Sequence, residues 1–457
     1  MTLKSINPYS GHVIYEFDEF SDNVVQRAIG MSYEAFRNLR NEPFRLRSGR
    51  MSKVAGVLKS RKEELAGVIT SEMGKPIRES IAEIEKCAWL CEYYARNAAE
   101  FLKNEIIQTG ADQSYVRYDP LGPVLAVMPW NFPFWQVFRF ASPNIMAGNT
   151  ALLKHASNVQ QCALMIEAVF KEAGFPENIF KTLVIGSSLV KKVIMNERVK
   201  AVTLTGSEKA GESVAETAGR FLKKSVLELG GSNAFIVLDD ADLDLAVETG
   251  VKARMQNAGQ SCIAAKRFIV QKKVYDKYLD LFLNKVKQLS VGDPMDQGTD
   301  MGPLSSVRQA ELVHEQVYDA ISKGAALLLG GHRKGAFYEP TVLTNINRDM
   351  NVFSEEVFGP VASFFRVEDD NEALEAANDT AFGLGTTVMT SDPSRAGFFI
   401  SGCDDGAVFI NELVKSDPRL PFGGTKRSGY GRELSFHGIK EFMNTKTIYI
   451  NQSGKNT

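Results

Sequence analysis

The sequence of 457 residues lacks the features that mark membrane-spanning and nucleic-acid-binding proteins. Its 53 basic and 55 acidic residues leave a formal net charge of -2, so we expect no electrostatic attraction to nucleic acid or to an anionic membrane. No apolar run approaches the roughly 18 residues that a membrane-spanning helix needs. The amino terminus carries neither a signal-peptide core nor an arginine-rich amphipathic segment, and we therefore expect a cytoplasmic protein.

Cysteine and histidine are also scarce, with 5 residues of each type. An odd number of scattered cysteines argues against a disulfide framework, and no Cys or His cluster has the spacing of a metal site. Cys87 and Cys91 lie one helical turn apart, but two small apolar residues on a packed helix explain them better than a metal or redox pair does. A reactive cysteine in this chain would therefore need a base other than histidine.

The order of predicted helices and strands indicates an α/β protein with two units. Amphipathic periodicity predicts helices over residues 21–105, and apolar strands then alternate with helices, which is typical of a parallel, doubly wound sheet. Further apolar strands between residues 234 and 410 predict a second α/β unit, with Gly230-Gly231 between the two. The strands of the first unit are predicted at residues 124–128, 150–154, 182–185 and 201–205. Residues 446–451 predict an edge strand that pairs either with another subunit or within the chain.

One loop presents a single thiol between two regular elements. The pattern over residues 243–255 predicts a helix, the apolar run 268–270 predicts a strand, and Cys262 lies between them. Catalytic groups concentrate in loops held by rigid elements, so Cys262 is a candidate nucleophile. The alternative is a buried structural cysteine, which is the commonest role of an unpaired one.

Two polar residues in apolar surroundings would complement a thiol nucleophile. Glu228 lies inside an apolar run, where its pKa should be raised, and it suits a general base unless it forms a structural ion pair. Asn131, between Trp130 and Phe132, either satisfies backbone groups or donates to an oxyanion.

The GxGxxG fingerprint of dinucleotide-binding folds is missing after the strand at residues 124–128. The nearest substitute is the turn Thr205-Gly206-Ser207 before a predicted helix. Its backbone N–H groups can hold a phosphate, although plain helix capping explains such a turn as well. Lys154, at a strand end, is either a ligand of ribose hydroxyls or a solvated lysine.

Together these motifs resemble the aldehyde dehydrogenase superfamily, in the same order and over essentially the whole chain. KHASN at 154–158 and GQSCIAAKR at 259–267 are most similar to bacterial members of its succinate-semialdehyde dehydrogenase group. The other matching segments are PWNFP at 129–133, the turn at 205–207, ELGG at 228–231, NAGQSC at 257–262, EEVFGPV at 355–361, and PFGG at 421–424 with Ser428-Gly429.

The resemblance implies an aldehyde dehydrogenase fold with three parts. A variant Rossmann-like cofactor domain on a five-stranded sheet would comprise residues 1–106 and 122–230, and it accounts for the missing GxGxxG fingerprint. An α/β catalytic domain would comprise residues 231–432. A small β oligomerisation arm would comprise residues 107–121 and 433–457, and self-association would run through its strand.

The resemblance also implies roles for single residues. Cys262 would be the nucleophile, Glu228 the base that activates a hydrolytic water, and Asn131 with the Cys262 backbone N–H the oxyanion hole. Ser157 stands where NAD-specific relatives often carry Glu, so NADP should be accepted beside NAD. The implied cofactor-binding residues are Pro129, Trp130, Lys154, Ser157, Gly206, Ser207, Leu229, Glu356 and Phe358.

The implied substrate is a small aldehyde, most specifically succinic semialdehyde, oxidised to succinate through a thiohemiacetal and a thioester on Cys262. Arg139 matches a carboxylate-binding arginine of that group. A second arginine of many of those enzymes is Gln256 here, and Ser416 or Arg419 can compensate for it. The alternatives are a broader specificity for another semialdehyde or aliphatic aldehyde, and a non-catalytic structural role of the crystallin kind.

Overall fold

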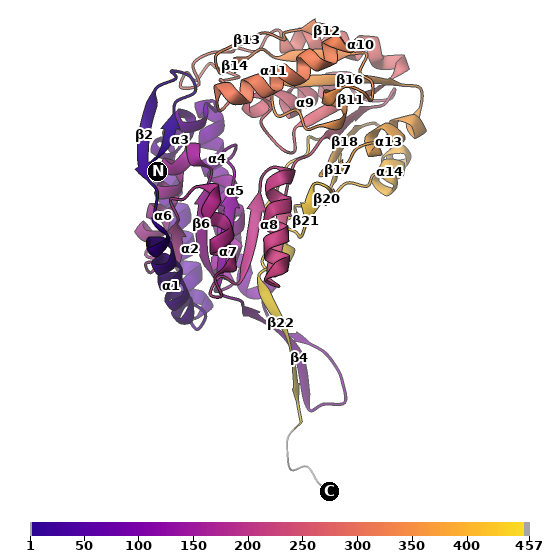
Figure 1. The fold of residues 1–457 in the computed structure, drawn as a ribbon. Helices are drawn as coiled ribbons and strands as arrows, with labels where there is room; N and C mark the ends of the chain where they lie inside the picture. Colours follow the sequence, from indigo (N-terminus) through magenta and orange to yellow (C-terminus); the bar gives the residue numbers. More distant parts are fainter. Residues whose placement is uncertain (1, 452–457) are drawn as a thin grey trace.

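The computed structural model describes residues 2–451, which form two α/β lobes and a slender arm (Figure 1). A hairpin starts the chain, and four helices follow it; the periodicity over residues 21–105 predicted helices there but not their number. The hairpin was not predicted, because most of its side chains face solvent and leave no clear apolar alternation. These elements are β1 (Thr2–Ile6), β2 (Val13–Asp18), α1 (Asp22–Leu39), α2 (Phe44–Ser60), α3 (Lys62–Met73) and α4 (Ile77–Phe101).

The sheet of the first lobe has the strand order β21-β9-β8-β5-β6-β7, and all its strands are parallel except β21. The chain builds β5, β6 and β7 in one direction and then β8 and β9 in the other, so the sheet is doubly wound, as predicted. The turns after β5 and β8 therefore leave the carboxyl edge side by side, where the winding reverses and such sheets bind ligands. The strands are β5 (Pro123–Met128), β6 (Thr150–His155), β7 (Phe180–Thr182), β8 (Ala201–Thr205), β9 (Lys224–Glu228) and β21 (Gly429–Tyr430).

Helices cover both faces of this sheet because successive side chains of a strand point to opposite sides. Val124 and Ala126 of β5 pack toward the helices α2 to α6, whereas Leu125 packs toward α1, α7 and α8. The remaining helices of the lobe are α5 (Trp135–Met146), α6 (Gln160–Glu172), α7 (Val190–Met195) and α8 (Glu208–Arg220).

One predicted strand is displaced. The apolar run at residues 182–185 predicted a strand there, but β7 ends at Thr182. Leu183, Val184 and Ile185 are nevertheless buried, and the amide of Leu183 donates to the Leu153 carbonyl oxygen at 2.7 Å. Apolar character thus identified the buried segment correctly, whereas the strand that pairs in the sheet ends before most of that segment.

The second lobe is built on a sheet of order β12-β15-β16-β11-β10-β18-β19, in which only β12 runs antiparallel to its neighbour. This is the second α/β unit that the sequence predicted. Its strands are β10 (Asn233–Val237), β11 (Ala265–Gln271), β12 (Ala326–Leu329), β15 (Thr341–Thr344), β16 (Val361–Val367), β18 (Thr386–Met389) and β19 (Val408–Ile410). Its helices are α9 (Leu243–Met255), α10 (Lys272–Val286), α11 (Val307–Ser322), α12 (Asn351–Ser354), α13 (Asp370–Asn378) and α14 (Pro393–Gly402). Two short pairs, β13 (Arg333–Lys334) with β14 (Phe337–Tyr338) and β17 (Phe382–Gly383) with β20 (Thr425–Lys426), complete it.

The arm projects from the first lobe as a three-stranded antiparallel sheet (Figure 1). β22 (Met443–Ile450) pairs along its whole length with β4 (Gln113–Pro120), and β3 (Glu105–Ile106) lies on the other side of β4. Of the two pairings that the sequence left open, the structure therefore shows the one within the chain, with β22 at the edge.

Part of the predicted arm segment 433–457 belongs to the first lobe. Leu434, Ile439 and Phe442, around the short helix α15 (Ser435–Gly438), are buried in its core. Residues 452–457 lie outside the described residues. Within residues 2–451, no helix is both long and apolar enough to cross a membrane, and no cluster of His, Cys, Asp and Glu has the arrangement of a metal site.

Candidate active site

Two cavities meet at the loop that carries Cys262. The larger, of about 570 Å³, is lined by the turns after β5 and β8 and by residues of the second lobe. The smaller, of about 320 Å³, is lined by α4, α5 and the loop before Pro421. Of the described residues that line them, Cys262 alone is common to both. Its thiol therefore lies where a ligand in one cavity can meet a ligand in the other.

The backbone of this loop is held in an unusual conformation. α9 ends at Met255, as the sequence predicted, and Asn257 and Ala258 then adopt positive φ angles of 53° and 51°. Such residues cost about 1–3 kcal/mol each and persist only when their surroundings fix them. The Asn257 amide Nδ2 donates to the Asn131 carbonyl oxygen at 2.8 Å, and its backbone N–H donates to Glu79 at 2.9 Å. The loop is thus tied to both the turn after β5 and the helix α4.

The two glycines between the lobes allow a close approach. A Cβ on Gly230 would lie 2.7 Å from Glu356 Oε2, and a Cβ on Gly231 would lie 2.7 Å from the Cys262 carbonyl oxygen. Both contacts are too short for a real Cβ, so a side chain at either position would push Glu356 or the Cys262 loop away. The glycine pair therefore sets the spacing of the site.

The surroundings of the Cys262 thiol favour its neutral form. Burial raises its pKa to about 11, although the nearby Arg139 guanidinium acts in the opposite direction. Lys266 donates hydrogen bonds of 2.9 Å to the carbonyl oxygens of Ser261 and Cys262, so it fixes the backbone of the loop. A further positive charge or a base is needed to form the thiolate.

Asn131 and the backbone of Cys262 offer hydrogen-bond donors beside the thiol. Asn131 is buried in the turn after β5, and its Nδ2 donates to the Gln260 carbonyl oxygen at 3.2 Å, which uses one of its two N–H groups. Within residues 2–451, the backbone N–H of Cys262 has no hydrogen-bond acceptor. Asn131 and Cys262 both line the larger cavity, so these two donors suit the oxyanion-binding role that the family resemblance implies.

Glu228 lies at the end of β9 and is deeply buried, with 2% of its surface exposed. Burial raises the pKa of its carboxyl well above the usual value, and Arg139 opposes this shift. Neither carboxyl oxygen has a hydrogen-bond partner among the described residues, and Glu228 lines neither cavity. A Cβ on Gly423 would lie 2.8 Å from its Oε1, so the carboxyl packs against the PFGG loop. The structure thus brings the Glu228 carboxyl group into the electrostatic environment of Cys262 but not into the space that a ligand would enter.

Arg139 does line the smaller cavity, but it already has a carboxylate partner. Its guanidinium forms a buried ion pair with Glu433 and lies 4.5 Å from the ring centre of Phe422. Arg139 Nη2 also donates a hydrogen bond of 3.4 Å to Thr205 Oγ1. The sequence suggested Arg139 as a ligand of the substrate carboxylate; in this structure its charge is neutralised within the protein.

Seven of the predicted cofactor-binding residues line the larger cavity: Pro129, Trp130, Gly206, Ser207, Leu229, Glu356 and Phe358. Trp130 and Phe358 meet edge to face with ring centres 5.6 Å apart. Ser207 caps α8 by accepting a hydrogen bond from the Ala210 amide at 3.4 Å. Glu356 accepts from the Gly231 amide at 3.2 Å and pairs with Lys266 at 3.0 Å.

Lys154 and Ser157 do not line this cavity. Lys154 is the penultimate residue of β6, the neighbour of β5, and Ser157 follows that strand at the same edge of the sheet. Lys154 is buried, and burial lowers the pKa of its ammonium group. Ser157 is exposed at the start of a short turn of 3₁₀ helix (Ser157–Val159).

The predicted substrate residues separate into two groups. Gln256 and Ser416 line the smaller cavity together with Arg139. Arg419 does not, because its exposed side chain pairs with Asp417 at 2.7 Å and lies over the Trp89 ring. Arg419 is therefore not available to replace the arginine missing at position 256.

Sequence reasoning missed Lys86, a lysine of α4 that lines the smaller cavity. Its Nζ donates to Ser416 Oγ at 2.9 Å and lies 4.1 Å from the ring centre of Trp135. Burial lowers the pKa of Lys86 to about 8. Helical periodicity carried a signal for it, since Lys86 follows the buried Glu83 by three positions and precedes the buried Leu90 by four.

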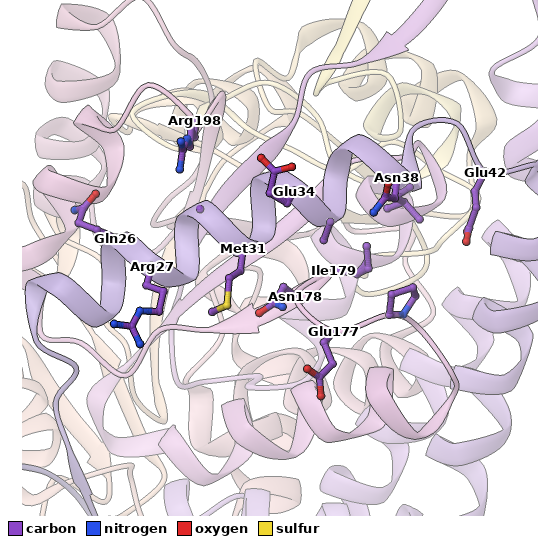
Figure 2. A pocket seen from close by; sticks show the side chains of 14 residues that line it. Gln26, Arg27, Met31, Glu34, Asn38, Glu42, Glu177, Asn178, Ile179 and Arg198 are labelled. Carbon is purple, nitrogen blue, oxygen red and sulfur yellow. The ribbon is translucent and has the colours of Figure 1, made fainter.

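A third hollow, of about 620 Å³, lies at the outer side of the first lobe (Figure 2). Gln26, Arg27, Met31, Glu34 and Asn38 of α1 line it together with the loop at residues 177–179, toward which Met31 points. Its described lining contains neither cysteine nor histidine, and the hollow is open to solvent. It offers no chemistry comparable to that at Cys262.

The chain matches the model of the aldehyde dehydrogenase family over residues 1–448. It therefore belongs to that family, and its fold is the aldehyde dehydrogenase fold that the motifs predicted.

Individual relatives extend this likeness. The chain is 49% identical over 453 residues to the probable succinate-semialdehyde dehydrogenase [NADP(+)] of Synechocystis sp., covering 98% of this chain and 100% of the relative. It is 49% identical to the succinate-semialdehyde dehydrogenase [NADP(+)] of Mycobacterium avium, covering 99% and 98% of the two chains. The crystal structure of succinic semialdehyde dehydrogenase from Streptococcus pyogenes in complex with NADP+ is similar with a TM-score of 0.96 and 39% identity, covering 98% and 100%.

Proposed function

We propose that this protein is an NAD(P)+-dependent aldehyde dehydrogenase that oxidises succinic semialdehyde to succinate. The observation that carries the proposal is the position of Cys262, which lines both the cavity suited to a dinucleotide and the cavity suited to a small aldehyde. The relatives of Synechocystis and Mycobacterium avium, which are named for this substrate and for NADP, support the choice of both.

The larger cavity has the chemistry that a dinucleotide requires. The N-terminus of α8 offers backbone N–H groups for a pyrophosphate, the Glu356 carboxylate can accept from ribose hydroxyls, and Trp130 and Phe358 offer apolar ring faces and edges. Lys154 would bind a ribose of the same ligand. Ser157 places no negative charge where a 2′-phosphate would lie, so NADP is accepted, together with NAD.

Catalysis begins at Cys262. Its thiolate adds to the aldehyde carbon, and Asn131 Nδ2 and the Cys262 backbone N–H stabilise the oxyanion of the resulting thiohemiacetal. The bound dinucleotide supplies the hydride acceptor, and the loss of hydride leaves a thioester on Cys262.

Hydrolysis of the thioester requires Glu228. Its carboxylate removes a proton from a water that attacks the thioester carbon, which releases the carboxylic acid and restores the Cys262 sulfur. Because Glu228 lines neither cavity in this structure, its side chain must turn away from Gly423 to meet that water. The raised pKa of its carboxyl suits a group that takes a proton near neutral pH.

We also propose that copies of the chain associate through β22. This strand is an open edge of the arm sheet, and its Tyr449 is 57% exposed and its Ile450 39% exposed. The double substitution Tyr449→Lys and Ile450→Lys should lower the mass found by light scattering, and an unchanged mass would exclude this edge. The five free cysteines fit a reducing, cytoplasmic environment.

The test of the proposed activity is the formation of reduced cofactor, followed by its near-ultraviolet absorbance, with succinic semialdehyde, butyraldehyde and a longer aliphatic aldehyde. We expect succinic semialdehyde to have the highest kcat/KM, with NADP+ active. Cys262→Ala should bind NADP+ and form no product. A preference for a neutral aldehyde would favour the broader specificity, and no turnover of any aldehyde with either cofactor would overturn the proposal.

A further inference from the structure

We infer that Lys86, together with Ser416, binds the distal carboxylate of an acid-tailed aldehyde in the smaller cavity. This inference rests on the proposed function, since it concerns how that same site selects its substrate. The Lys86 ammonium and the Ser416 hydroxyl are joined by a hydrogen bond of 2.9 Å and both line the cavity that reaches Cys262.

The charges around the cavity single out Lys86. Four basic side chains line it: Lys86, Arg139, Lys252 and Lys415. Arg139 is held by Glu433, and Lys415 pairs with Glu412 at 2.6 Å. Lys252 is exposed to solvent in the last turn of α9. Lys86 is part-buried and forms no ion pair with a carboxylate of the described residues, so its charge remains available to a ligand.

The carboxylates of the cavity lining are already engaged. Glu83 forms a buried ion pair with Lys75 and accepts hydrogen bonds from the amides of Phe134 and Trp135 at 2.8 and 2.9 Å. Glu79 accepts from the Asn257 amide at 2.9 Å, and burial raises the pKa of its carboxyl to about 7, which reduces its negative charge. The negative charges of Glu83 and Glu79 are therefore compensated or reduced, so they do not prevent an anionic ligand from binding beside Lys86.

The position of Lys86 is well defined. Glu83, three residues earlier in α4, ties this helix to the start of α5 through the two amides just named, and Trp135 lies there. The Lys86 ammonium lies 4.1 Å from the Trp135 ring centre, which limits its freedom to turn toward solvent. A charge held in partly desolvated surroundings gains most from an ionic partner. Lys86 can give one hydrogen bond to a carboxylate and keep another to Ser416, whose hydroxyl can then donate to the same carboxylate.

The ligand class follows from this arrangement. An aldehyde carbon must reach the Cys262 sulfur, while an anionic group must reach the Lys86 ammonium and the Ser416 hydroxyl in the same cavity of about 320 Å³. A short ω-oxo carboxylate meets both demands. A neutral aldehyde of equal length reaches Cys262 and leaves Lys86 without an ionic partner.

The test compares succinic semialdehyde with butyraldehyde in the Lys86→Met variant. We expect kcat/KM for succinic semialdehyde to fall on the order of 50-fold, mainly through KM, because a charged hydrogen bond is lost. For butyraldehyde it should change less than about threefold, because no carboxylate is present. Lys86→Arg should retain most of the preference. Lys53→Met, which removes an exposed lysine of α2, is the matched control and should leave kcat/KM unchanged for both aldehydes.

A pH series adds a second measurement. The pKa of Lys86 is lowered to about 8 by burial and by Arg139, while Cys87, Glu83 and Asp417 act in the opposite direction. The other charged groups of the cavity are Glu79, Lys252, Glu412 and Lys415. Lys86 is therefore protonated below about pH 8 and loses its charge above it, so the KM for succinic semialdehyde should rise above pH 8 while the KM for butyraldehyde stays level.

Succinate titrated into the free enzyme by calorimetry gives a readout that does not depend on turnover. We expect its affinity to drop in Lys86→Met and to be kept in Lys53→Met. Equal losses for both aldehydes, or an unchanged preference together with unchanged succinate affinity, would overturn the role of Lys86. Inactivity of the unaltered enzyme toward every aldehyde would instead overturn the proposed function, so the two failures are distinguishable.

Discussion

The ionisation of Cys262 can be measured directly through its rate of alkylation by iodoacetamide. With a pKa of about 11, about one thiol in a thousand is ionised at pH 8. Because the thiolate is the reactive form, the rate should rise about tenfold for each pH unit between pH 7 and 10. Mass spectrometry of the labelled peptides identifies the cysteine that reacts.

Cys403 serves as an internal comparison for this measurement. It is also part-buried, and burial raises its pKa to about 12, so its thiolate fraction at any pH below 10 should be about tenfold lower than that of Cys262. Arg139 is the strongest influence that lowers the pKa of Cys262, so Arg139→Met should slow the alkylation of Cys262 further. Oxidised NADP is cationic at its nicotinamide ring, and its presence should speed the reaction at least about tenfold, equivalent to one pKa unit.

Two results would refute this account of the thiol. A rate that levels off below pH 9 without cofactor would mean that the resting thiol is already ionised. Equal rates with and without NADP+ would mean that the cofactor does not activate Cys262, and a base in the protein would have to do so.

Three further predictions concern the residues around Cys262. Glu228→Gln should keep a pre-steady-state burst of reduced cofactor while steady-state turnover collapses, and loss of the burst would mean that Glu228 also activates the thiol. Asn131→Ala should lower turnover on the order of a hundredfold, since an oxyanion donor contributes about 3 kcal/mol, and a loss below about threefold would remove Asn131 from that role. Glu433→Gln leaves the Arg139 charge buried and should lower the free energy of unfolding by about 3–5 kcal/mol, whereas an unchanged midpoint of thermal unfolding would show that the charge is compensated elsewhere.

Much of the fold was predictable because burial leaves a local pattern in the sequence. Apolar runs and helical periodicity predicted the two sheets and the helical character of the segment before β4, but not its division into four helices. The hairpin of β1 and β2 has little such pattern, because it lies on the surface. At residues 182–185 the apolar run is buried as predicted, but it is not the segment that pairs in the sheet. The predicted strand position was therefore wrong by a few residues, although the predicted burial was correct.

The site was predictable where its residues lie in distinctive loops and less so where partners are distant in sequence. Cys262, Asn131 and the turn at 205–207 were singled out as candidates from local context, and all of them line the larger cavity. The ion pair between Arg139 and Glu433 joins α5 to a segment near the end of the chain, and no local pattern predicts that pairing. The same holds for Lys86 and Ser416, which meet only because α4 and the loop before Pro421 line one cavity.

The meeting of two cavities at a single sulfur has a consequence for the order of events. Each cavity has its own lining, and Cys262 is the one described residue that both linings share. In the proposed mechanism, an acyl group on the thiol would lie in the smaller cavity, and a dinucleotide in the larger cavity would not have to pass it. In the proposed mechanism, the reduced dinucleotide would therefore be able to leave before water attacks the thioester. In the proposed mechanism, the lifetime of the thioester on Cys262 would then decide how long the smaller cavity stays occupied after the dinucleotide has left the larger one.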